Sequence, residues 1–291
     1  MTTIAALIAQ SAEALSAAGL HFGHGSDNAF DEAAELVLFG AGRRHVEAPG
    51  VYDVVVDEAT ARRVQDLIAR RIRERVPAAY LTHRMWFAGL EFYVDERVLV
   101  PRSPIAELVE TGFSPWLDAS RIRRVLDIGT GSGCIACACA VAFPAADVDA
   151  VDISVSALEV AKINIQRHRL AARVRPVHGN VYAGLEGTRY DLIVANPPYV
   201  SHAEMAELPL EYRHEPELGL RAGADGLDVV RRILAGADAH LERDGILVVE
   251  VGDSEAALIA AFPQLPFTWL EFERGGGGVF LLTGKEIGVR G

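Results

Sequence analysis

The sequence predicts an α/β fold: a doubly wound, mostly parallel sheet of seven strands, preceded by a small helical domain and a short hairpin. From residue 124 onward, short apolar runs typical of buried strands alternate with longer segments whose apolar residues repeat at helical spacing. This alternation favours parallel strands with helices on both faces of the sheet. Before residue 84 the apolar residues follow a helical period only.

Residues 1–83 form the predicted N-terminal helical domain. Three helices are expected in it, at about residues 4–15, 31–38 and 57–76. The loop between the first two contains His21 and His24, which we interpret as structural residues rather than metal ligands. The domain shows no nucleophile motif and no metal-ligand spacing, so we expect it to dock the substrate.

Residues 84–103 form a predicted hairpin linker between the two domains. Short runs rich in β-branched and aromatic residues flank a break at Ala88–Gly89, the pattern of two strands and a tight turn. The second of these strands is expected to reach Val94, and a further strand is expected at Val98–Val100.

Residues 104–291 form the predicted catalytic domain. Ser103 is a favourable N-cap and Pro104 a favourable first helical residue, so a helix is expected to begin there. Arg102, directly before it, is either a solvated charge or points at a ligand, and both interpretations stay open. Strands are expected at residues 125–128, 147–151, 174–178, 191–195, 246–251, 267–272 and 279–282, with helices at 134–143, 155–168, 227–241 and 255–262. The last two strands have no helix between them, which favours an antiparallel hairpin at one edge.

The charge of the chain argues against a protein that binds naked nucleic acid through its overall field. The 291 residues carry a formal net charge of −12, which suits a basic partner instead. No run of about 18 uncharged apolar residues occurs, so no membrane span is expected. The N-terminal region has Glu13 and no basic stretch, so no signal peptide is expected and the chain is assigned to the cytoplasm.

Three cysteines, Cys134, Cys137 and Cys139, begin with the Cys-x-x-Cys spacing found in zinc and redox sites. The chain has no second pair, and the surrounding residues form an apolar helical segment. We therefore interpret the cysteines as small buried core residues and predict no metal.

A glycine-rich turn follows the first strand of the predicted sheet. Asp127-Ile-Gly129-Thr-Gly131-Ser-Gly133 lies between a strand and a helix, where glycines permit a tight turn and close approach of the backbone to a ligand. The spacing is not the Gly-x-Gly-x-x-Gly of dinucleotide-binding folds, and the Gly-Lys-Ser/Thr of a P-loop is absent. Asp152 ends the second strand, where a carboxylate accepts hydrogen bonds from ribose hydroxyls.

This turn resembles the first motif of the class I S-adenosylmethionine methyltransferases, a family with this sheet and an antiparallel last strand. The resemblance implies S-adenosylmethionine as cofactor and S-adenosylhomocysteine as product. The residues implied to bind it are Asp127, Gly129, Thr130, Gly131, Ser132, Gly133, Asp152, Ile153, Asn180, Val181 and Asn196. The family often has aspartate where this chain has Asn180, so the expected adenine contact at Asn180–Val181 departs most from the family pattern.

The stretch Asn196-Pro197-Pro198-Tyr199 ends the fourth strand. As a bare pattern it could be a strand followed by an Asn-Pro turn. It also resembles the signature of methyltransferases that alkylate planar amide or amino nitrogens. In that interpretation the Asn196 side-chain oxygen and the Pro197 carbonyl accept the two N–H bonds of the substrate, and Tyr199 packs on the planar group. The catalytic residues are therefore predicted to be Asn196, Pro197, Pro198 and Tyr199, without a strong general base.

Nearly the whole chain resembles the protein-glutamine methyltransferases of the translation apparatus. The resemblance is carried by Pro77–Thr82, Phe87–Val94 and Val98–Arg102. Glu96–Ile105 and Leu210–Gly219, together with Phe22–Asn28, are similar to the branch that acts on the third large-subunit ribosomal protein. The resemblance thus implies methyl transfer to a glutamine of that basic protein, either free or within the assembling large ribosomal subunit.

Three alternatives remain open. The release-factor branch usually has Arg-Pro-Glu-Thr-Glu after the linker and Glu-His-Gly in the fifth strand, where this chain has Arg102-Ser-Pro-Ile-Ala-Glu107 and Glu250-Val-Gly252. An amino methyltransferase for adenine or cytosine must flip a nucleotide and usually carries a basic domain, in contrast with this acidic chain. A cofactor-binding assembly factor without catalysis is the third. We expect no sequence-specific nucleic-acid partner and no membrane partner.

Overall fold

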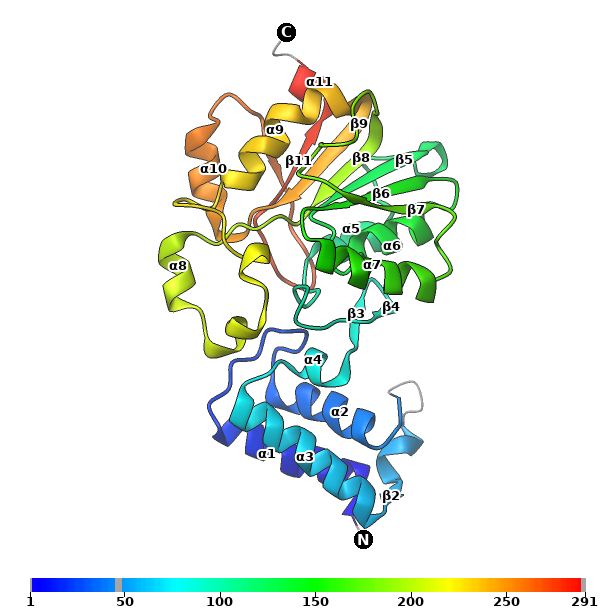
Figure 1. Cartoon of the computed structure of the whole chain (residues 1–291), viewed down its shortest axis with the longest axis vertical. Helices are drawn as coiled ribbons and strands as arrows, with labels where there is room; N and C mark the ends of the chain where they lie inside the picture. Colours follow the sequence, from blue (N-terminus) through cyan, green and yellow to red (C-terminus); the bar gives the residue numbers. More distant parts are fainter. Residues whose placement is uncertain (1, 45–48, 289–291) are drawn as a thin grey trace.

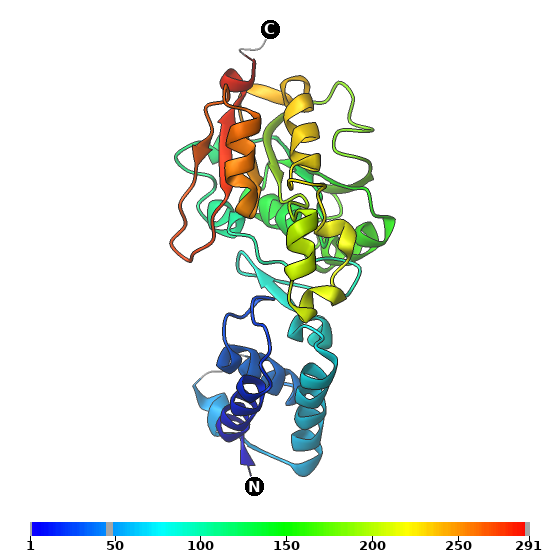
Figure 2. The same ribbon diagram turned by 90° about the vertical axis from the view of Figure 1, so that its left-hand side faces the viewer.

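The structure, a computed structural model, describes residues 2–44 and 49–288. Helices of the N-terminal region lie at one end of the long axis and an α/β domain lies at the other (Figures 1 and 2). Of the predicted N-terminal domain, residues 1 and 45–48 lie outside the described residues, as do residues 289–291 of the predicted catalytic domain. Within the described residues, no helix has the length and apolar character needed to cross a membrane.

The N-terminal helices pack around a hydrophobic core of their own. They are α1 (Ile4–Ala17), α2 (Ala29–Gly40), α3 (Glu58–Glu74) and the short α4 (Ala78–Thr82), accompanied by a two-residue ladder of β1 (Thr2–Thr3) with β2 (Val55–Val56). Thr3, Asn28 and Asp57 begin the three long helices, each accepting a hydrogen bond from the amide three residues later, at 3.2, 2.9 and 2.7 Å. The three predicted helices are confirmed, whereas the ladder is too short to leave a periodic signal.

The linker contains the predicted hairpin, formed by β3 (Met85–Phe87) and β4 (Leu90–Phe92). The strands are antiparallel, and both residues of the turn, Ala88 and Gly89, have positive φ values of 46° and 74°. The hairpin is therefore confirmed between residues 85 and 92.

The prediction that β4 reaches Val94 and that Val98–Val100 is a strand was wrong. The backbone groups that would pair with a neighbouring strand are bound by side chains instead. Asn164 accepts from the Tyr93 amide at 2.7 Å and donates to the Tyr93 carbonyl at 2.9 Å. The Val98 carbonyl accepts from the Tyr80 hydroxyl, and the Val100 amide donates to Glu215 Oε1 at 2.9 Å.

The catalytic domain is built on a seven-stranded sheet, which confirms the predicted fold class. In spatial order its strands are β10 (Thr268–Trp269), β11 (Val279–Thr283), β9 (Leu241–Glu250), β8 (Tyr190–Ala195), β5 (Arg124–Ile128), β6 (Asp147–Asp152) and β7 (Val174–His178). The pairs from β9 to β7 are parallel, and β11 is antiparallel to both β9 and β10. The edge hairpin expected at the end of the chain is therefore confirmed.

Helices cover both faces of this sheet (Figure 1). On one face lie α5 (Ile105–Glu110), α6 (Cys134–Ala142) and α7 (Val155–Arg167), and on the other lie α9 (Asp228–His240) and α10 (Glu255–Ala261). Two short helices, α8 (His202–Glu207) and α11 (Gly284–Gly288), were not predicted. The predicted helix start at Pro104 falls one residue later, with Pro104 as the cap and Ser103 Oγ accepting from the Ile105 amide at 3.2 Å.

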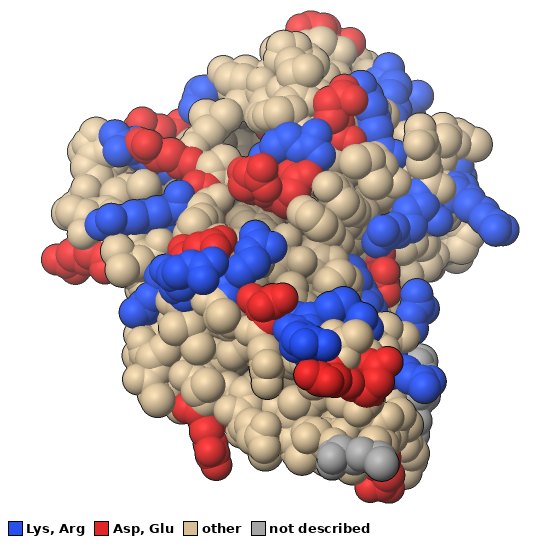
Figure 3. Space-filling model, turned by 60° about the horizontal axis from the view of Figure 1, so that its bottom comes forward, with Lys and Arg blue, Asp and Glu red and all other residues tan. Residues whose placement is uncertain are grey.

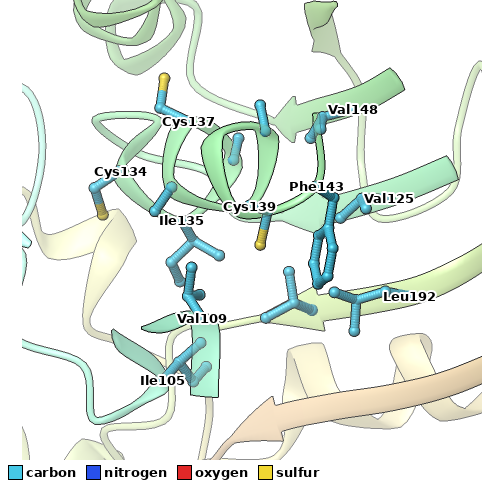
Figure 4. Packing of buried hydrophobic residues seen from close by; sticks show 14 of the residues in the cluster. Ile105, Val109, Val125, Cys134, Ile135, Cys137, Cys139, Phe143, Val148 and Leu192 are labelled. Carbon is cyan, nitrogen blue, oxygen red and sulfur yellow. The ribbon is translucent and has the colours of Figure 1, made fainter. Parts of the chain in front are cut away.

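The three cysteines lie on α6 inside the core between this helix and the sheet. All three thiols are free and buried, and burial raises the pKa of Cys134 to about 12. Figure 4 shows their sulfur atoms spread among aliphatic and aromatic side chains rather than converging on one point. The interpretation as core residues is confirmed.

The strand order creates a reversal point between β5 and β8. From β5 the chain builds outward to β6 and β7, and then returns to the other side of β5 to form β8 and β9. In open α/β sheets the crevice at such a point, beyond the carboxyl ends of the strands, is where ligands bind. Gly129 directly follows β5 and Asn196 directly follows β8, so both predicted motifs start there.

The insertion between β8 and α9 attaches the N-terminal helices to the catalytic domain. Glu211, in this insertion, is buried and accepts hydrogen bonds at 3.3 Å from Arg71, 3.1 Å from Arg75 and 3.1 Å from the His21 amide. His214 Nε2 lies 2.8 Å from the Glu74 carbonyl. The two domains are thus joined by charged and polar contacts in addition to the linker.

Candidate active site

A cavity of about 630 Å³ lies at the carboxyl ends of β5, β6 and β8. Its wall includes the glycine turn after β5, the end of β6 and the Asn-Pro-Pro-Tyr stretch after β8. Linker residues 97–103 and parts of the insertion, residues 204–221, contribute further wall. The two sequence motifs, one predicted for the cofactor and one for the acceptor, therefore share a single cavity.

The glycine turn has a backbone that side chains would disfavour. Gly129, Gly131 and Gly133 have φ values of 73°, 52° and 77°, in the left-handed region. A Cβ atom added at Gly131 would meet only the Gly129 carbonyl at 4.0 Å, whereas one added at Gly133 would lie 3.2 Å from Ala161 Cβ on α7. Gly129 and Gly131, with Thr130 and Ser132, line the cavity; Gly133 serves the packing of α6 against α7 and does not line it.

Asp152, at the end of β6, lines the cavity and braces the turn. Its Oδ2 accepts from the Gly131 amide at 2.9 Å and its Oδ1 accepts from the Ser154 amide at 2.8 Å. Burial raises the pKa of Asp152, although these amide hydrogen bonds oppose the shift. Because each carboxylate oxygen has two lone pairs, the group keeps acceptor capacity for hydroxyls of a ligand.

Asp127 lies beneath the turn rather than on the cavity wall. Its Oδ2 accepts from Thr130 Oγ1 at 2.5 Å and from the Ala136 amide at 3.1 Å, which ties the turn to the start of α6. Among the described residues, Asp127 Oδ1 has no hydrogen-bond partner. Burial raises the pKa of Asp127 to about 7, and the neighbouring Asp152 adds to the shift. Asp127 therefore fixes the shape of the turn and does not itself line the cavity.

Ile153, Asn180 and Val181 also line the cavity. The Ile153 side chain is half exposed, which is unusual for an aliphatic residue beside a buried strand. Asn180 Oδ1 accepts from Arg232 Nη1 on α9 at 2.9 Å, so its amide is held with the NH₂ group free to donate. Val181 has a φ of 60° despite its branched side chain. Arg232 was not predicted, because a single arginine in an amphipathic helix gives no signal in the sequence.

The acceptor stretch begins where β8 ends. Asn196 is half-buried and lines the cavity, and among the described residues its side chain has no hydrogen-bond partner. Its amide is therefore free to bind a ligand. Pro197, Pro198 and Tyr199 line the same cavity, and the Tyr199 hydroxyl donates to Glu250 Oε1 at 2.9 Å. All four predicted catalytic residues thus share the cavity with Asp152 and the turn.

Arg102 is paired within the protein, so its interpretation as a solvated charge was wrong. It lines the cavity and is held by Glu215 in a two-point ion pair, with its guanidinium 5.2 Å from the centre of the Tyr212 ring. His24 Nε2 lies 3.5 Å from Glu215 Oε2, and the two rings of His24 and Tyr212 are 4.5 Å apart. Burial raises the pKa of Glu215, but the adjacent His24 ring and the hydrogen bonds from Arg102 outweigh it and lower the pKa to about 2. His24 is therefore part of this polar cluster.

Within residues 2–44 and 49–288, no group of three or more His, Cys, Asp or Glu side chains is arranged to hold a metal ion.

The residues present fit the S-adenosylmethionine that the sequence predicts. The cavity volume lies within the range of roughly 300–1,000 Å³ typical of small-molecule sites. Asp152 offers a carboxylate for ribose hydroxyls, the glycine turn lacks Cβ atoms where a ligand would approach, and Ile153 offers an apolar surface to a flat ring.

Comparisons with known proteins agree with this arrangement. The family model described as "Methyltransferase small domain" matches residues 113–209, which include the turn and the Asn-Pro-Pro-Tyr stretch. The crystal structure of the hMettl16 catalytic domain in complex with a 3′UTR hairpin has a similar fold, with a TM-score of 0.52, 18% identity, and coverage of 77% of this chain and 81% of that one.

Curated relatives are far more similar. The ribosomal protein uL3 glutamine methyltransferase of Bordetella pertussis is 48% identical over 288 residues, covering 99% of this chain and 97% of its own. The protein of the same name from Neisseria meningitidis serogroup A is also 48% identical over 288 residues, covering 99% of this chain and 95% of its own. The resemblance found in the sequence is confirmed: the chain belongs to the family of ribosomal protein uL3 glutamine methyltransferases.

Proposed function

We propose that this protein transfers the methyl group of S-adenosylmethionine to the side-chain amide nitrogen of a glutamine in ribosomal protein uL3, leaving S-adenosylhomocysteine. The observation that carries the proposal is the position of Asn196: its side-chain amide, which has no hydrogen-bond partner within residues 2–44 and 49–288, lines the same cavity as the glycine turn and Asp152. The names of relatives at 48% identity support the substrate. Methylation of a ribosomal protein also assigns the reaction to the cytoplasm.

The bound cofactor would supply an electrophilic methyl group, so the chain's own residues have to bind and orient the reactants. Asp152 would accept hydrogen bonds from the ribose hydroxyls, and the turn from Gly129 to Ser132 would contact the cofactor through its backbone. Ile153, Asn180 and Val181 would surround the adenine. With Oδ1 held by Arg232, the Asn180 amide would donate to a ring nitrogen, a role that the aspartate common in the wider family could not fill.

The residues of the Asn-Pro-Pro-Tyr stretch would compensate for the low nucleophilicity of the substrate amide. The nitrogen of a primary amide is a poor nucleophile because its lone pair is delocalised into the carbonyl group. Asn196 Oδ1 and the Pro197 carbonyl would accept the two N–H bonds, and the Tyr199 ring would pack on the planar group. Fixing both hydrogens orients the lone pair toward the methyl group, and such orientation is a major source of rate enhancement.

The charge distribution supports a protein substrate. The chain is acidic overall, with a net charge of −12. On the face drawn in Figure 3, the Lys and Arg side chains are interspersed with Asp and Glu side chains and form no continuous basic surface. A nucleic acid is held mainly by phosphate contacts with clustered basic residues, whereas a basic ribosomal protein requires no such surface.

The N-terminal domain, residues 1–83, is proposed to dock the substrate. The domain has a separate core and adds nothing to the cavity wall from its helices, yet Glu211 fixes it to the insertion that lines the cavity. Hydrogen exchange on the full chain tests this role. Adding uL3 is expected to slow amide exchange in α1–α3, and slowing confined to the catalytic domain would contradict docking by the N-terminal helices.

The experiment for the function is methylation in vitro. The purified chain is incubated with methyl-tritiated S-adenosylmethionine and uL3, free or in immature large subunits, alongside release factors, DNA and transfer RNA. Label is expected in one glutamine of uL3, identified by mass spectrometry. Label in release factors or in nuclease-sensitive material, with none in uL3, would refute the proposed substrate.

A further inference from the structure

Tyr199 is held from several directions by residues that do not line the cavity. Its hydroxyl donates to Glu250 Oε1 at 2.9 Å, and its carbonyl accepts from Ser254 Oγ at 3.1 Å. A Cβ atom added at Gly252 would lie 2.6 Å from Cε2 of the Tyr199 ring, so the ring packs directly on the Gly252 backbone. The residues that hold Tyr199 all belong to the end of β9 and the segment directly after it. Tyr199 itself forms part of the cavity wall.

Glu250 is the last residue of β9, the strand beside β8, and only 5% of it is exposed. Its other oxygen, Oε2, accepts from Ser103 Oγ at 2.5 Å. Among the described residues it forms no ion pair with a Lys, Arg or His side chain. Burial raises the pKa of Glu250, with hydrogen bonds from Ser103 and Tyr199 and the more distant charge of Arg102 opposing the shift. A carboxylate buried without a cation in direct contact costs stability, which calls for a reason other than stability.

Building on the proposed function, we infer that Glu250 is a positioning residue for methyl transfer: it orients the ring of Tyr199 against the substrate amide by fixing the tyrosine hydroxyl. The Tyr199 and Ser103 hydroxyls both donate to the Glu250 carboxylate, one to each oxygen. With its proton committed to Glu250, the Tyr199 hydroxyl can only accept from any group in the cavity. An amide N–H is such a donor, and a carbonyl oxygen is not.

Glu250 also connects two segments of the cavity wall that are far apart in the sequence. The wall residues Ser103 and Tyr199 belong to the linker and to the stretch after β8, and Glu250 connects them through one side chain. Through Glu250, the linker at Ser103 is connected to the hydroxyl of Tyr199.

The test compares kcat and KM of the full chain with uL3 as substrate and saturating S-adenosylmethionine. Glu250→Ala is expected to lower kcat roughly tenfold to a hundredfold per folded molecule, the effect of a reacting group displaced by about 1 Å. In a second series, with S-adenosylmethionine varied at saturating uL3, KM for the cofactor is expected to stay at the wild-type value. Glu250→Gln is expected to recover most of the rate, because its amide oxygen still accepts from the tyrosine and the Ser103 hydroxyl can accept from its NH₂ group.

Tyr199→Phe removes the same hydrogen bond from the other side and tests the proposal even if Glu250→Ala fails to fold. It is expected to lower kcat by a similar factor, and adding Glu250→Ala to it is expected to have little further effect, because the two residues act as one unit. Glu286→Ala is the matched control: Glu286 also accepts from an amide and a hydroxyl, both of Thr283, but beside the amino-terminal half of β9. It is expected to lower the melting temperature and leave kcat unchanged.

A wild-type rate per folded molecule in Glu250→Ala, or in Tyr199→Phe where Glu250→Ala does not fold, would overturn the inference. So would effects of Glu250→Ala and Tyr199→Phe that multiply in the double variant. Absence of uL3 methylation by the wild-type chain would refute the proposed function, and the inference with it. An active wild type with unaffected variants would refute the inference alone.

Discussion

Arg102 and Glu215, 113 residues apart in the sequence, form a two-point ion pair at the cavity wall, with Nη1–Oε1 and Nη2–Oε2 distances of 2.5 and 2.7 Å. The Glu215 side chain is fully buried, and its Oε1 also accepts from the Val100 amide. One carboxylate thus joins the linker to the insertion after β8. Four residues earlier, Glu211 joins the same insertion to the N-terminal helices.

The first prediction concerns this pair. At pH 7, Glu215→Gln is expected to lower the free energy of unfolding by about 3 kcal/mol, because it leaves Arg102 largely buried without its counter-charge. Urea denaturation followed by circular dichroism measures the loss. Glu217→Gln is the matched control on the same segment, since Glu217 is exposed and forms an ion pair with the exposed Arg221; a change within about 0.5 kcal/mol is expected for it. Equal effects of the two variants would contradict the account.

The same pair has a defined pH dependence. The pKa of Glu215 is lowered in the folded protein to about 2 from an ordinary value of 4.5. Its stabilisation is therefore fully present above pH 4.5 and is lost as the pH falls from 4.5 toward 2. The stability difference between wild type and Glu215→Gln is expected to narrow over this window, and a constant difference would show that the charge of Glu215 is not the cause.

The second prediction concerns the cofactor. Asp152→Ala is expected to weaken binding of S-adenosylmethionine by about 1.5–3 kcal/mol, because the ribose hydroxyls lose a charged acceptor. Isothermal titration calorimetry measures the affinity. Asp147→Ala, at the exposed start of the same strand, is the control and should bind normally. An unchanged affinity in Asp152→Ala would remove this carboxylate from the binding site.

The third prediction concerns Asp127 in the cofactor-free protein. Its pKa is raised by burial from 3.8 to about 7, so the folded state binds its proton more tightly than the unfolded chain does. The stabilisation is present below pH 3.8 and is lost as the pH rises to about 7, a change on the order of 4 kcal/mol. Asp127→Asn is expected to remove this slope from the pH dependence of unfolding. Parallel curves for the two proteins would contradict the raised pKa.

The sequence was sufficient to predict the sheet and to assign the motifs that follow its strands. Buried parallel strands are short apolar runs, and the carboxyl end of each strand faces the crevice, so Gly129 and Asn196 could be assigned to one site from local patterns. The strand expected at Val98–Val100 shows where this reasoning fails. Its apolar residues are β-prone, but Tyr80 and Glu215, which bind its backbone, are distant in the sequence.

Residues that act through a second residue could not be found in this way. Glu250 ends an apolar strand and Glu215 lies in an insertion without regular periodicity, so neither stands out by spacing. Their importance comes from burial and from partners more than 100 residues away in the sequence, Ser103 and Arg102. One signal was present: the Glu-Val-Gly sequence at the end of β9, which places Gly252 where only a glycine fits beneath the Tyr199 ring.

The fourth prediction concerns Asn196, which carries the proposed chemistry. Asn196→Ala is expected to slow methyl transfer by a factor of roughly 100 to 1,000, about 2.7–4 kcal/mol, because the substrate amide loses a preorganised acceptor. The fold and the cofactor affinity should remain near those of wild type, since Asn196 lies at a strand end and makes no side-chain hydrogen bond within the described residues. Asn196→Asp keeps an acceptor and is expected to retain partial activity.

The most direct test of the central claim is the single-turnover rate of methyl transfer to the uL3 glutamine at saturating cofactor, measured for these three proteins beside their thermal melts. The account predicts the order wild type, then Asn196→Asp, then Asn196→Ala, with similar melting temperatures. A wild-type rate per folded molecule in Asn196→Ala, accompanied by a lowered melting temperature, would show that Asn196 only begins a turn and would contradict the account.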